Sequence, residues 1–322
     1  MSTDVERYLD VVARRRTTGG LERIRWICEQ LGDPQFGAPT VHITGTNGKG
    51  STARLAAALL QAGGWRTGLY TSPHLVHVGE RVLIDGEPLP PAEFDRAIRR
   101  LRPVFDQVSE EVSFGPSRFE VFTALALDLF TGVEARVLEV GIGGRLDPTN
   151  IVDAEVAVLT NVDLDHVEYL GRERSTIAAD KAGIIKPGAT AIAGPMAPEL
   201  TAIVARRCTE VGATLWAAGG EYTLEQQPRP GGLTLTVRTP GRTYRDIDIP
   251  FRGAHQGQNA ACALASVEAL IGPVPEDLVR AAWASVSNPG RFEVFPGAPP
   301  IVVDVAHNPH GVAALTAQLA EE

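Results

Sequence analysis

The chain has 322 residues, of which 44% are hydrophobic and 21% charged, so it has the composition of a globular protein and the length of one large domain or two. Its net charge of −9 argues against non-specific binding to nucleic acid. No apolar run approaches the roughly 20 residues that a membrane-spanning helix needs, and the first residues lack the basic start and apolar core of a signal peptide.

The three cysteines, Cys28, Cys208 and Cys262, lie far apart and outside metal-binding spacing. Such cysteines are typical of buried free thiols in a reducing compartment. We therefore expect a cytoplasmic protein without a nucleic-acid or membrane partner.

Strand and helix patterns alternate along the first two thirds of the chain. Helical spacing over residues 4–31, interrupted at residues 17–20, predicts two helices. Beyond them we expect strands at residues 40–44, 66–70, 135–140, 156–160, 189–194 and 214–217, and helices at residues 50–62, 91–107, 120–131, 175–183 and 198–210. This alternation predicts an α/β fold in which helices cover both faces of a parallel sheet. Ligands of such sheets bind at the carboxyl ends of the strands.

The last third of the chain changes character. Strictly alternating runs beside Pro-Gly turns predict a small antiparallel sheet within about residues 219–250. Residues 288–291 have the composition of a hinge, and residues 301–305 predict a buried strand. Helices are expected at residues 257–271, 275–286 and 311–320. Because one strand and one helix cannot bury a core alone, the end of the chain either packs on the main body or begins an incomplete second domain.

The most informative stretch is residues 44–52, Thr-Gly-Thr-Asn-Gly-Lys-Gly-Ser-Thr, which follows an apolar strand. A strand that runs through glycines into a helix makes a phosphate cradle, since free N–H groups at the helix start point at the anion. Lys49 supplies a charge for the terminal phosphates, and Ser51 and Thr52 supply hydroxyls for Mg²⁺ or phosphate. The loop departs from the Walker spacing, because Gly50 separates the lysine from the hydroxyl. An ordinary strand-to-helix turn is the alternative, but a chain with only three lysines has one here.

Four other segments combine glycines, carboxylates and histidines at the ends of predicted strands. They are Thr-Ser-Pro-His-Leu at residues 71–75, Glu-Val-Gly-Ile-Gly-Gly-Arg-Leu-Asp-Pro-Thr-Asn at residues 139–150, Asn-Val-Asp-Leu-Asp-His-Val-Glu-Tyr-Leu-Gly at residues 161–171, and Asp-Val-Ala-His-Asn-Pro-His-Gly at residues 304–311. Together with the phosphate loop, they would gather at one edge of the sheet.

In combination, these motifs resemble the folylpolyglutamate synthase/dihydrofolate synthase family of Mur-type ligases, from about residue 20 to the end of the chain. The resemblance implies a P-loop parallel sheet with a small antiparallel subdomain, residues 1–295, and the start of a Rossmann-like C-terminal domain, residues 296–322. It also implies that ATP phosphorylates a carboxylate and that the amino group of L-glutamate then attacks the acyl phosphate. Charge on the transferring phosphoryl group calls for cations and metal ions, and two metals can brace the attacking and leaving oxygens.

By resemblance, three groups of residues surround ATP. The ATP contacts are Thr46, Asn47, Gly48, Lys49, Gly50, Ser51, Thr52, Asn259, Arg291 and Asp304. The ligands of two Mg²⁺ ions are Ser51, Ser72, Glu139, His166 and Lys181, the last as a carbamate. Lys49, Lys181 and His307 act in catalysis, with His307 near the incoming glutamate. The alternatives are structural: a helix cap or ion pair for Glu139, a turn at Ser72, a surface lysine at position 181 and a capping role for His307.

The resemblance also implies a folate site. Its residues are Gly19, Gly20, Leu21, Ser117, Arg118, Phe119, Glu120, Leu146, Asp147 and Pro148. Many family members carry an aspartate where this chain has Thr18 or Gly19, and that acid is a natural partner for pterin nitrogens. Plain core packing is the alternative for Phe119.

We therefore expect a monomeric, ATP- and Mg²⁺-dependent ligase that joins L-glutamate to pteroate, to reduced folates or to both. A Mur-type ligase for another carboxylate and a non-catalytic nucleotide-binding fragment remain open. A simple P-loop phosphotransferase would not need residues 304–311.

Overall fold

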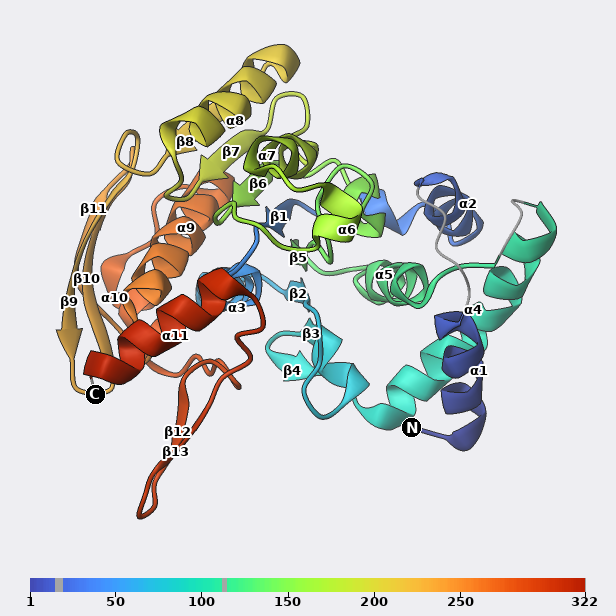
Figure 1. Cartoon of the computed structure of the whole chain (residues 1–322). Helices are drawn as coiled ribbons and strands as arrows, with labels where there is room; N and C mark the ends of the chain where they lie inside the picture. The colour runs from blue at the N-terminus through green and yellow to red at the C-terminus, as the bar shows by residue number, and fades with distance from the viewer. Residues whose placement is uncertain (15–19, 112–114, 322) are drawn as a thin grey trace.

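The computed structural model describes residues 1–14, 20–111 and 115–321. Its centre is a sheet in which six neighbouring strands run parallel and two antiparallel strands extend one edge (Figure 1). The strands in spatial order are β4 (Glu87–Pro88), β3 (Val82–Ile84), β2 (Thr67–Tyr70), β5 (Ala135–Glu139), β1 (Thr40–Thr44), β6 (Val156–Leu159), β7 (Thr190–Ala193) and β8 (Thr214–Ala217). The predicted α/β fold is confirmed.

Helices cover both faces of this sheet, because its central strands are apolar on both sides. In β5, Val137 faces one hydrophobic cluster and Leu138 faces another. The first cluster is completed by α3 (Lys49–Ala62), α9 (Ala254–Ile271) and α10 (Glu276–Ala284). The opposite face is covered by α1 (Thr3–Ala13), α2 (Glu22–Gln30), α4 (Pro91–Glu111), α5 (Arg118–Leu129), α7 (Arg174–Ala182) and α8 (Pro198–Val211).

The predicted antiparallel sheet is also present. It consists of β9 (Thr223–Arg229), β10 (Gly232–Arg238) and β11 (Thr243–Ile249), in the order β11-β10-β9. The inward residues of its alternating strands, such as Leu235 and Ile247, join the same cluster as α3 and α9. Trp283 of α10 is fully buried there and donates from Nε1 to the carbonyl of Leu55 in α3 at 3.1 Å. The small sheet is therefore fixed to the helices behind the phosphate loop.

Some short elements were not predicted from the sequence. Strands β3 and β4 and the single-turn helices η1 (Pro34–Phe36), η2 (Val78–Arg81), η3 (Pro148–Ile151) and α6 (Val167–Leu170) are each four residues or fewer. Strands β3 and β4 have only three and two residues, and a helix of a single turn shows no repeat of an apolar face, so the pattern does not reveal them.

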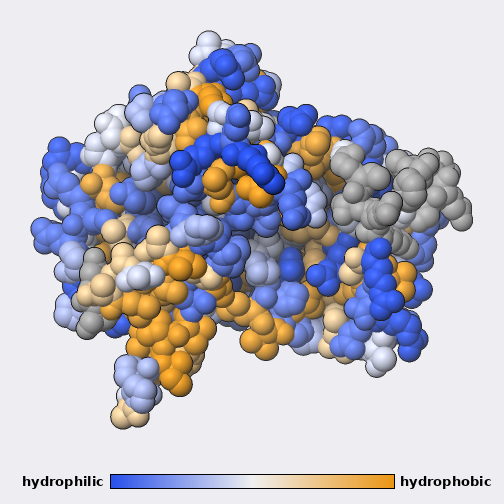
Figure 2. All heavy atoms as spheres, viewed as in Figure 1, coloured by the Kyte–Doolittle hydropathy of each residue, from blue (hydrophilic) through white to orange (hydrophobic). Residues whose placement is uncertain are grey.

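The prediction of a buried strand at residues 301–305 is wrong. The strand β13 (Ile301–Val303) pairs only with β12 (Glu293–Phe295), and this hairpin projects from the body of the molecule, ahead of the last helix α11 (Pro309–Glu321) (Figure 1). Ile301 is 62% exposed. Figure 2 shows a hydrophobic surface over this hairpin and α11. An apolar run predicts a strand, but only its neighbours decide whether the strand is buried.

Two smaller expectations can be compared with the structure. The cysteines Cys28, Cys208 and Cys262 are free and buried, as predicted. Among the described residues, no helix combines the length and the apolar character needed to cross a membrane.

Candidate functional site

The phosphate loop lies between the carboxyl end of β1 and the first turn of α3. Gly45 and Gly48 have φ angles of 154° and 82°, which favour glycine. A Cβ on Gly45 would lie 1.8 Å from Thr160 Oγ1, and one on Gly48 would lie 2.1 Å from Asn259 Oδ1. The loop thus needs glycine at both points for space as well as for backbone conformation. Asn259, predicted as an ATP contact, packs against the loop from α9.

Side chains from the end of β6 hold the loop in place. Asn161 accepts a hydrogen bond from the Asn47 N–H at 2.9 Å and donates to the Asn47 carbonyl at 3.1 Å. Thr46 Oγ1 accepts from the backbone N–H of Asp163 at 2.9 Å. These bonds fix the backbone of the two residues that precede Gly48.

Two lysines converge on one carbonyl of the loop. Lys49 Nζ donates to Gly45 O at 3.0 Å, and Lys181 Nζ, from α7, donates to the same oxygen at 2.9 Å. Burial lowers the pKa of both side chains, and for Lys181 the additional charge of Lys49 contributes to a pKa of about 7. Lys181 is therefore not a surface lysine. Both residues line a small cavity together with Asp165 and His166.

Glu139 ends β5 beside the start of α3. Its carboxylate is buried, accepts a hydrogen bond from the Ser72 N–H at 2.9 Å and lies 3.4 Å from the position that a Cβ on Gly50 would occupy. Burial raises the pKa of Glu139, and the charges of Lys49 and Arg291 act in the opposite direction. The sequence-predicted residues of the loop, of β5 and of the segment after β2 thus meet at one point.

Ser51 and Thr52 are buried in the first turn of α3, and they differ in their partners. Ser51 Oγ accepts a hydrogen bond from Asn288 Nδ2 at 2.9 Å. Thr52 Oγ1 is buried and has no hydrogen-bond partner among the residues that the structure describes. Asn288 was predicted only as part of a hinge, and the structure shows that it reaches the loop.

The residues predicted to fit a metal form a loose group. Among the described residues, no three or more His, Cys, Asp or Glu side chains are placed to hold a metal ion by themselves. A Mg²⁺ site does not need three such side chains, because one or two carboxylates together with substrate phosphates and waters suffice as ligands. Of the residues predicted as ligands, Glu139 offers a buried carboxylate, and Ser72 meets it through its backbone N–H.

His166 and His307 both approach the carboxylate of Asp165. His166, with a φ of 47°, precedes α6, and its Nε2 lies 3.9 Å from Asp165 Oδ2. His307 Nε2 lies at the same distance from that oxygen, and the side chain is 67% exposed. Burial lowers the pKa of His166, and Asp165 acts in the opposite direction. The structure therefore brings the C-terminal segment up to the histidine that follows β6.

Arg291 and Asp304 enter from the same C-terminal segment. Burial lowers the pKa of Arg291, whereas the charges of Glu139 and Asp304 raise it. Asp304 accepts hydrogen bonds from the N–H groups of Phe292 at 2.8 Å and Ala306 at 2.7 Å. Its carboxylate ties the strands of the hairpin to the loop that carries His307, so its oxygens already have structural partners.

The predicted folate residues form two clusters. Gly19 lies outside the described residues, and Gly20 and Leu21 lead into α2. Glu120 is buried, and its carboxylate accepts a hydrogen bond from the N–H of Ser117, the residue that caps the start of α5. The same carboxylate forms an ion pair with Arg23 at 3.1 Å, so it joins α2 to α5. The second cluster surrounds Gly141.

Gly141 separates Phe119 from Asp147. A Cβ on Gly141 would lie 2.6 Å from the Phe119 ring, and the Gly141 N–H donates to Asp147 Oδ2 at 3.0 Å. Asp147 also accepts from Ile142 and Thr149 and is buried, whereas Leu146 is exposed and Pro148 starts η3. Phe119 is half-buried and packs against the hydrophobic cluster beneath α5, and the Asp147 carboxylate accepts hydrogen bonds from the backbone of its own loop.

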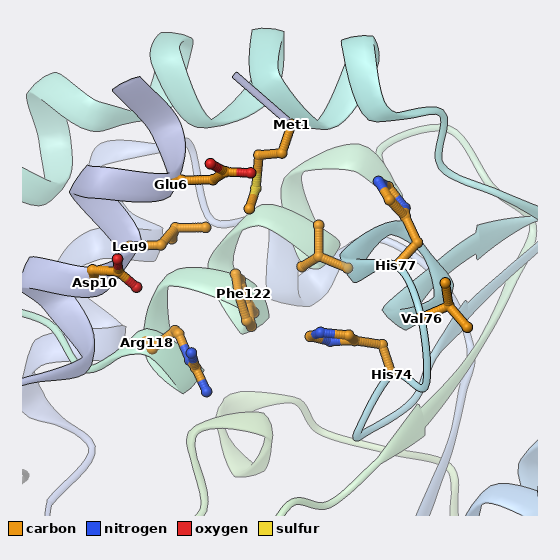
Figure 3. A pocket seen from close by; sticks show the side chains of 10 residues that line it. Met1, Glu6, Leu9, Asp10, His74, Val76, His77, Arg118 and Phe122 are labelled. Carbon is orange, nitrogen blue, oxygen red and sulfur yellow. The ribbon is translucent and has the colours of Figure 1, made fainter. Parts of the chain in front are cut away.

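A cavity of about 410 Å³ opens between α1, α5 and the loop after β2 (Figure 3). Its lining is Met1, Glu6, Leu9, Asp10, His74, Val76, His77, Val78, Arg118 and Phe122. The carboxylates come from α1, and the basic groups come from α5 and the loop (Figure 3). His74 is only two residues beyond Ser72. Sequence reasoning identified Arg118 but missed the cavity, because nothing in the local pattern of α1 signals a ligand.

Comparison with known proteins gives one consistent result. Residues 108–267 match the family profile of the Mur ligase middle domain. The chain is 41% identical to the dihydrofolate synthase/folylpolyglutamate synthase of Mycobacterium tuberculosis, across 95% of this chain and 67% of that protein. It is 34% identical to the folylpolyglutamate synthase of Lacticaseibacillus casei, across 98% of this chain and 76% of that protein.

Solved structures agree with the sequence matches. The M. tuberculosis folylpolyglutamate synthase complexed with ADP superposes with a TM-score of 0.94 at 40% identity, covering 99% of this chain and 73% of that chain. An FPGS–AMPPCP–folate complex superposes with a TM-score of 0.94 at 34% identity, covering 99% and 80% of the two chains.

Proposed function

The chain belongs to the folylpolyglutamate synthase/dihydrofolate synthase family of ATP-dependent Mur-type ligases, and we propose that it joins L-glutamate to the carboxylate of a pteroate or a reduced folate through an acyl phosphate. The observation that carries the proposal is the convergence of Lys49, Glu139 and Arg291 at the carboxyl ends of β1 and β5. Buried cations beside a phosphate loop suit a reaction in which charge develops on a phosphoryl group.

In the proposed reaction, an oxygen of the acceptor carboxylate attacks the γ-phosphorus of ATP, and ADP leaves. The amino group of L-glutamate then attacks the carbonyl carbon of the acyl phosphate, loses a proton, and expels inorganic phosphate. The N–H groups at the start of α3 and the ammonium of Lys49 hold the phosphates. Arg291 offers a planar, bidentate partner for the transferring phosphoryl group.

Mg²⁺ would be held by Glu139 with the hydroxyls of Ser51 and Ser72, and at a second site by His166 and a carbamate on Lys181. Bound there, it would neutralise phosphate charge and orient the oxygens of ATP. Carbamylation would also replace one of the two cations that share the Gly45 carbonyl with an anion, which removes their repulsion.

The carbamate has a direct test. If Lys181 is carbamylated, Lys181→Ala should lose most of its ligase activity and recover part of it in the presence of a small carboxylate such as acetate. Lys186→Ala, which removes an amine that bonds the Asn150 carbonyl, is the matched control and should not respond to acetate. Failure of acetate to raise the activity of Lys181→Ala would leave the carbamate without support.

We further propose that the cavity of Figure 3 receives the body of the acceptor, since it begins two residues beyond Ser72 and carries Arg118. Arg118→Ala should then raise KM for the acceptor while leaving KM for ATP unchanged. The chain would act as a monomer, with residues 1–295 as the ATP-binding domain and residues 296–322 as the beginning of a C-terminal domain. Its three buried free thiols support a reducing compartment such as the cytoplasm.

The experiment that tests this function is a paired assay with ATP, Mg²⁺ and L-glutamate, with dihydropteroate in one reaction and tetrahydrofolate in the other. Product is identified by mass, and ADP release is measured by a coupled enzyme. A product heavier by one glutamyl residue establishes the ligase, and the reaction in which it forms identifies the acceptor. ADP binding without product in either reaction would favour a non-catalytic nucleotide-binding fragment.

A further inference from the structure

Asn308 lies between β13 and α11 and is only 6% exposed. Its amide nitrogen donates to Asn47 Oδ1 at 3.0 Å and to Asp165 Oδ2 at 2.9 Å. Its amide oxygen accepts from Asn47 Nδ2 at 3.3 Å and from the Gly311 N–H at 2.8 Å. Both ends of this buried amide are therefore used, and two of the four bonds form a reciprocal pair with Asn47.

These bonds join three segments that are far apart in the sequence. Asn47 belongs to the phosphate loop, Asp165 lies after β6 beside His166, and Asn308 comes from the C-terminal segment. Asp165 lines the same small cavity as Lys49. The amide of Asn308 thus holds the side chain of Asn47 in the phosphate loop and, at the same time, the carboxylate of Asp165 in the small cavity.

Only an amide can make this set of bonds, because it offers donors and an acceptor on one planar group. His310 adds a further contact, with its Nδ1 2.9 Å from Asn47 Nδ2. Without Asn308, the Asn47 side chain would lose a reciprocal pair of hydrogen bonds, and Asp165 would lose its bond to the C-terminal segment.

We propose that Asn308 is a positioning residue for the phosphate loop, holding Asn47 and Asp165 in the arrangement that receives the nucleotide. It acts through these two partners rather than on the reacting atoms. The proposal rests on the proposed use of ATP by this site. It implies that the affinity of the phosphate loop for nucleotide depends on a segment more than 250 residues away in the sequence.

The main alternative is that Asn308 serves only as the cap of α11, through its bond to the Gly311 N–H. Asn308→Asp separates the two roles. A carboxylate keeps the acceptor for Gly311, but it has no donor for Asn47 and places a second negative charge against Asp165. Asn308→Ala removes every bond, and Thr316→Ala, which loses only a bond within α11 to the Val312 carbonyl, is the control in the same segment.

The test is the affinity for ADP, measured by calorimetry, together with KM for ATP and the melting temperature of each variant. We expect Asn308→Ala to weaken ADP binding about tenfold, as the loss of one or two net hydrogen bonds predicts. Asn308→Asp should weaken it at least as much when ADP is titrated well below the melting transition of each variant, and Thr316→Ala should bind ADP normally. KM for ATP should follow the ADP affinity.

Wild-type ADP affinity in Asn308→Asp would overturn the positioning role, since the cap survives that substitution whereas the hydrogen bonds that Asn308 donates to Asn47 and Asp165 are lost. If the unaltered chain itself binds no ADP, the proposed ATP-dependent function fails as well, so the two failures are distinguishable.

Discussion

Strands β5 and β13 look alike in the sequence, since in each a few apolar residues lead to a carboxylate, but their surroundings differ. β5 lies between β2 and β1, and all its residues are buried. β13 has one partner strand, and its side chains are largely exposed. The carboxylates differ accordingly. Glu139 is buried near Lys49 and Arg291, whereas Asp304 is satisfied by two backbone N–H groups.

This difference shows how one pattern yields two roles. A carboxylate that has few backbone partners and lies beside cations can hold a cation. A carboxylate with backbone partners on both oxygens stabilises a turn. The main sheet therefore provides the chemistry, and the C-terminal segment provides groups that approach it, namely Arg291, His307 and Asn308.

The largest expected effect concerns the chemistry at the end of the main sheet. Lys49→Ala should lower ATP turnover by about 10³-fold or more, since the charge beside the phosphates is lost from a buried site. The fold should persist, because Lys49 bonds only loop carbonyls. Turnover is measured by ADP release and the fold by circular dichroism. Unchanged turnover in a folded variant would refute the assignment of the loop.

A matched pair of substitutions sharpens the comparison of the strands. Leu138→Ala in β5 should reduce the free energy of unfolding by about 3 kcal/mol, because it leaves a cavity in a closed core. Ile301→Ala in β13 should change it by about 0.5 kcal/mol or less, since Ile301 is mostly exposed. Urea unfolding measures both values. Equal destabilisation would mean that the hairpin is as closely packed as the sheet.

A smaller effect is expected for pH. Burial lowers the pKa of His42 in β1 from 6.5 to about 3, so His42 stays neutral in the folded chain at pH 5 while the unfolded chain binds a proton. This group therefore adds full stability above pH 6.5 and loses it as the pH falls toward 3. Between pH 7.5 and pH 5 it should reduce the free energy of unfolding by about 2 kcal/mol.

His42→Gln provides the comparison, because it removes the titrating group while leaving an amide near Thr149, the hydrogen-bond partner of His42. Urea unfolding at the two pH values should show a smaller acid loss for His42→Gln than for the unaltered chain. An equal loss in both chains would assign the acid sensitivity to other groups.

The sequence predicted the parallel strands of the main sheet, since short apolar runs such as residues 40–44 and 214–217 alternate with helical stretches and lie close to glycines. The exposure of Ile301 could not be predicted, because burial depends on packing partners and not on the strand itself. Strands β3 and β4 were too short to leave a pattern.

The site shows the same limit. The motifs placed Lys49 and Glu139 at one edge of the sheet, because strand ends converge there, whereas the place of Lys181 came only from the family resemblance. They could not show that Asn288 reaches Ser51 or that Asn308 bridges Asn47 and Asp165, since those bonds depend on how the C-terminal segment approaches the loop. Nor could the motifs show that the carboxylate of Glu120 forms an ion pair with Arg23.

The most direct measurement of the central claim follows the oxygen atoms. The acceptor is labelled with heavy oxygen in the carboxylate that receives glutamate, and the inorganic phosphate released with ATP, Mg²⁺ and L-glutamate is analysed by mass. An acyl-phosphate route transfers one labelled oxygen from the carboxylate to the phosphate and keeps the other in the amide. Glutamylated product with unlabelled phosphate would contradict activation of the carboxylate by ATP at this site.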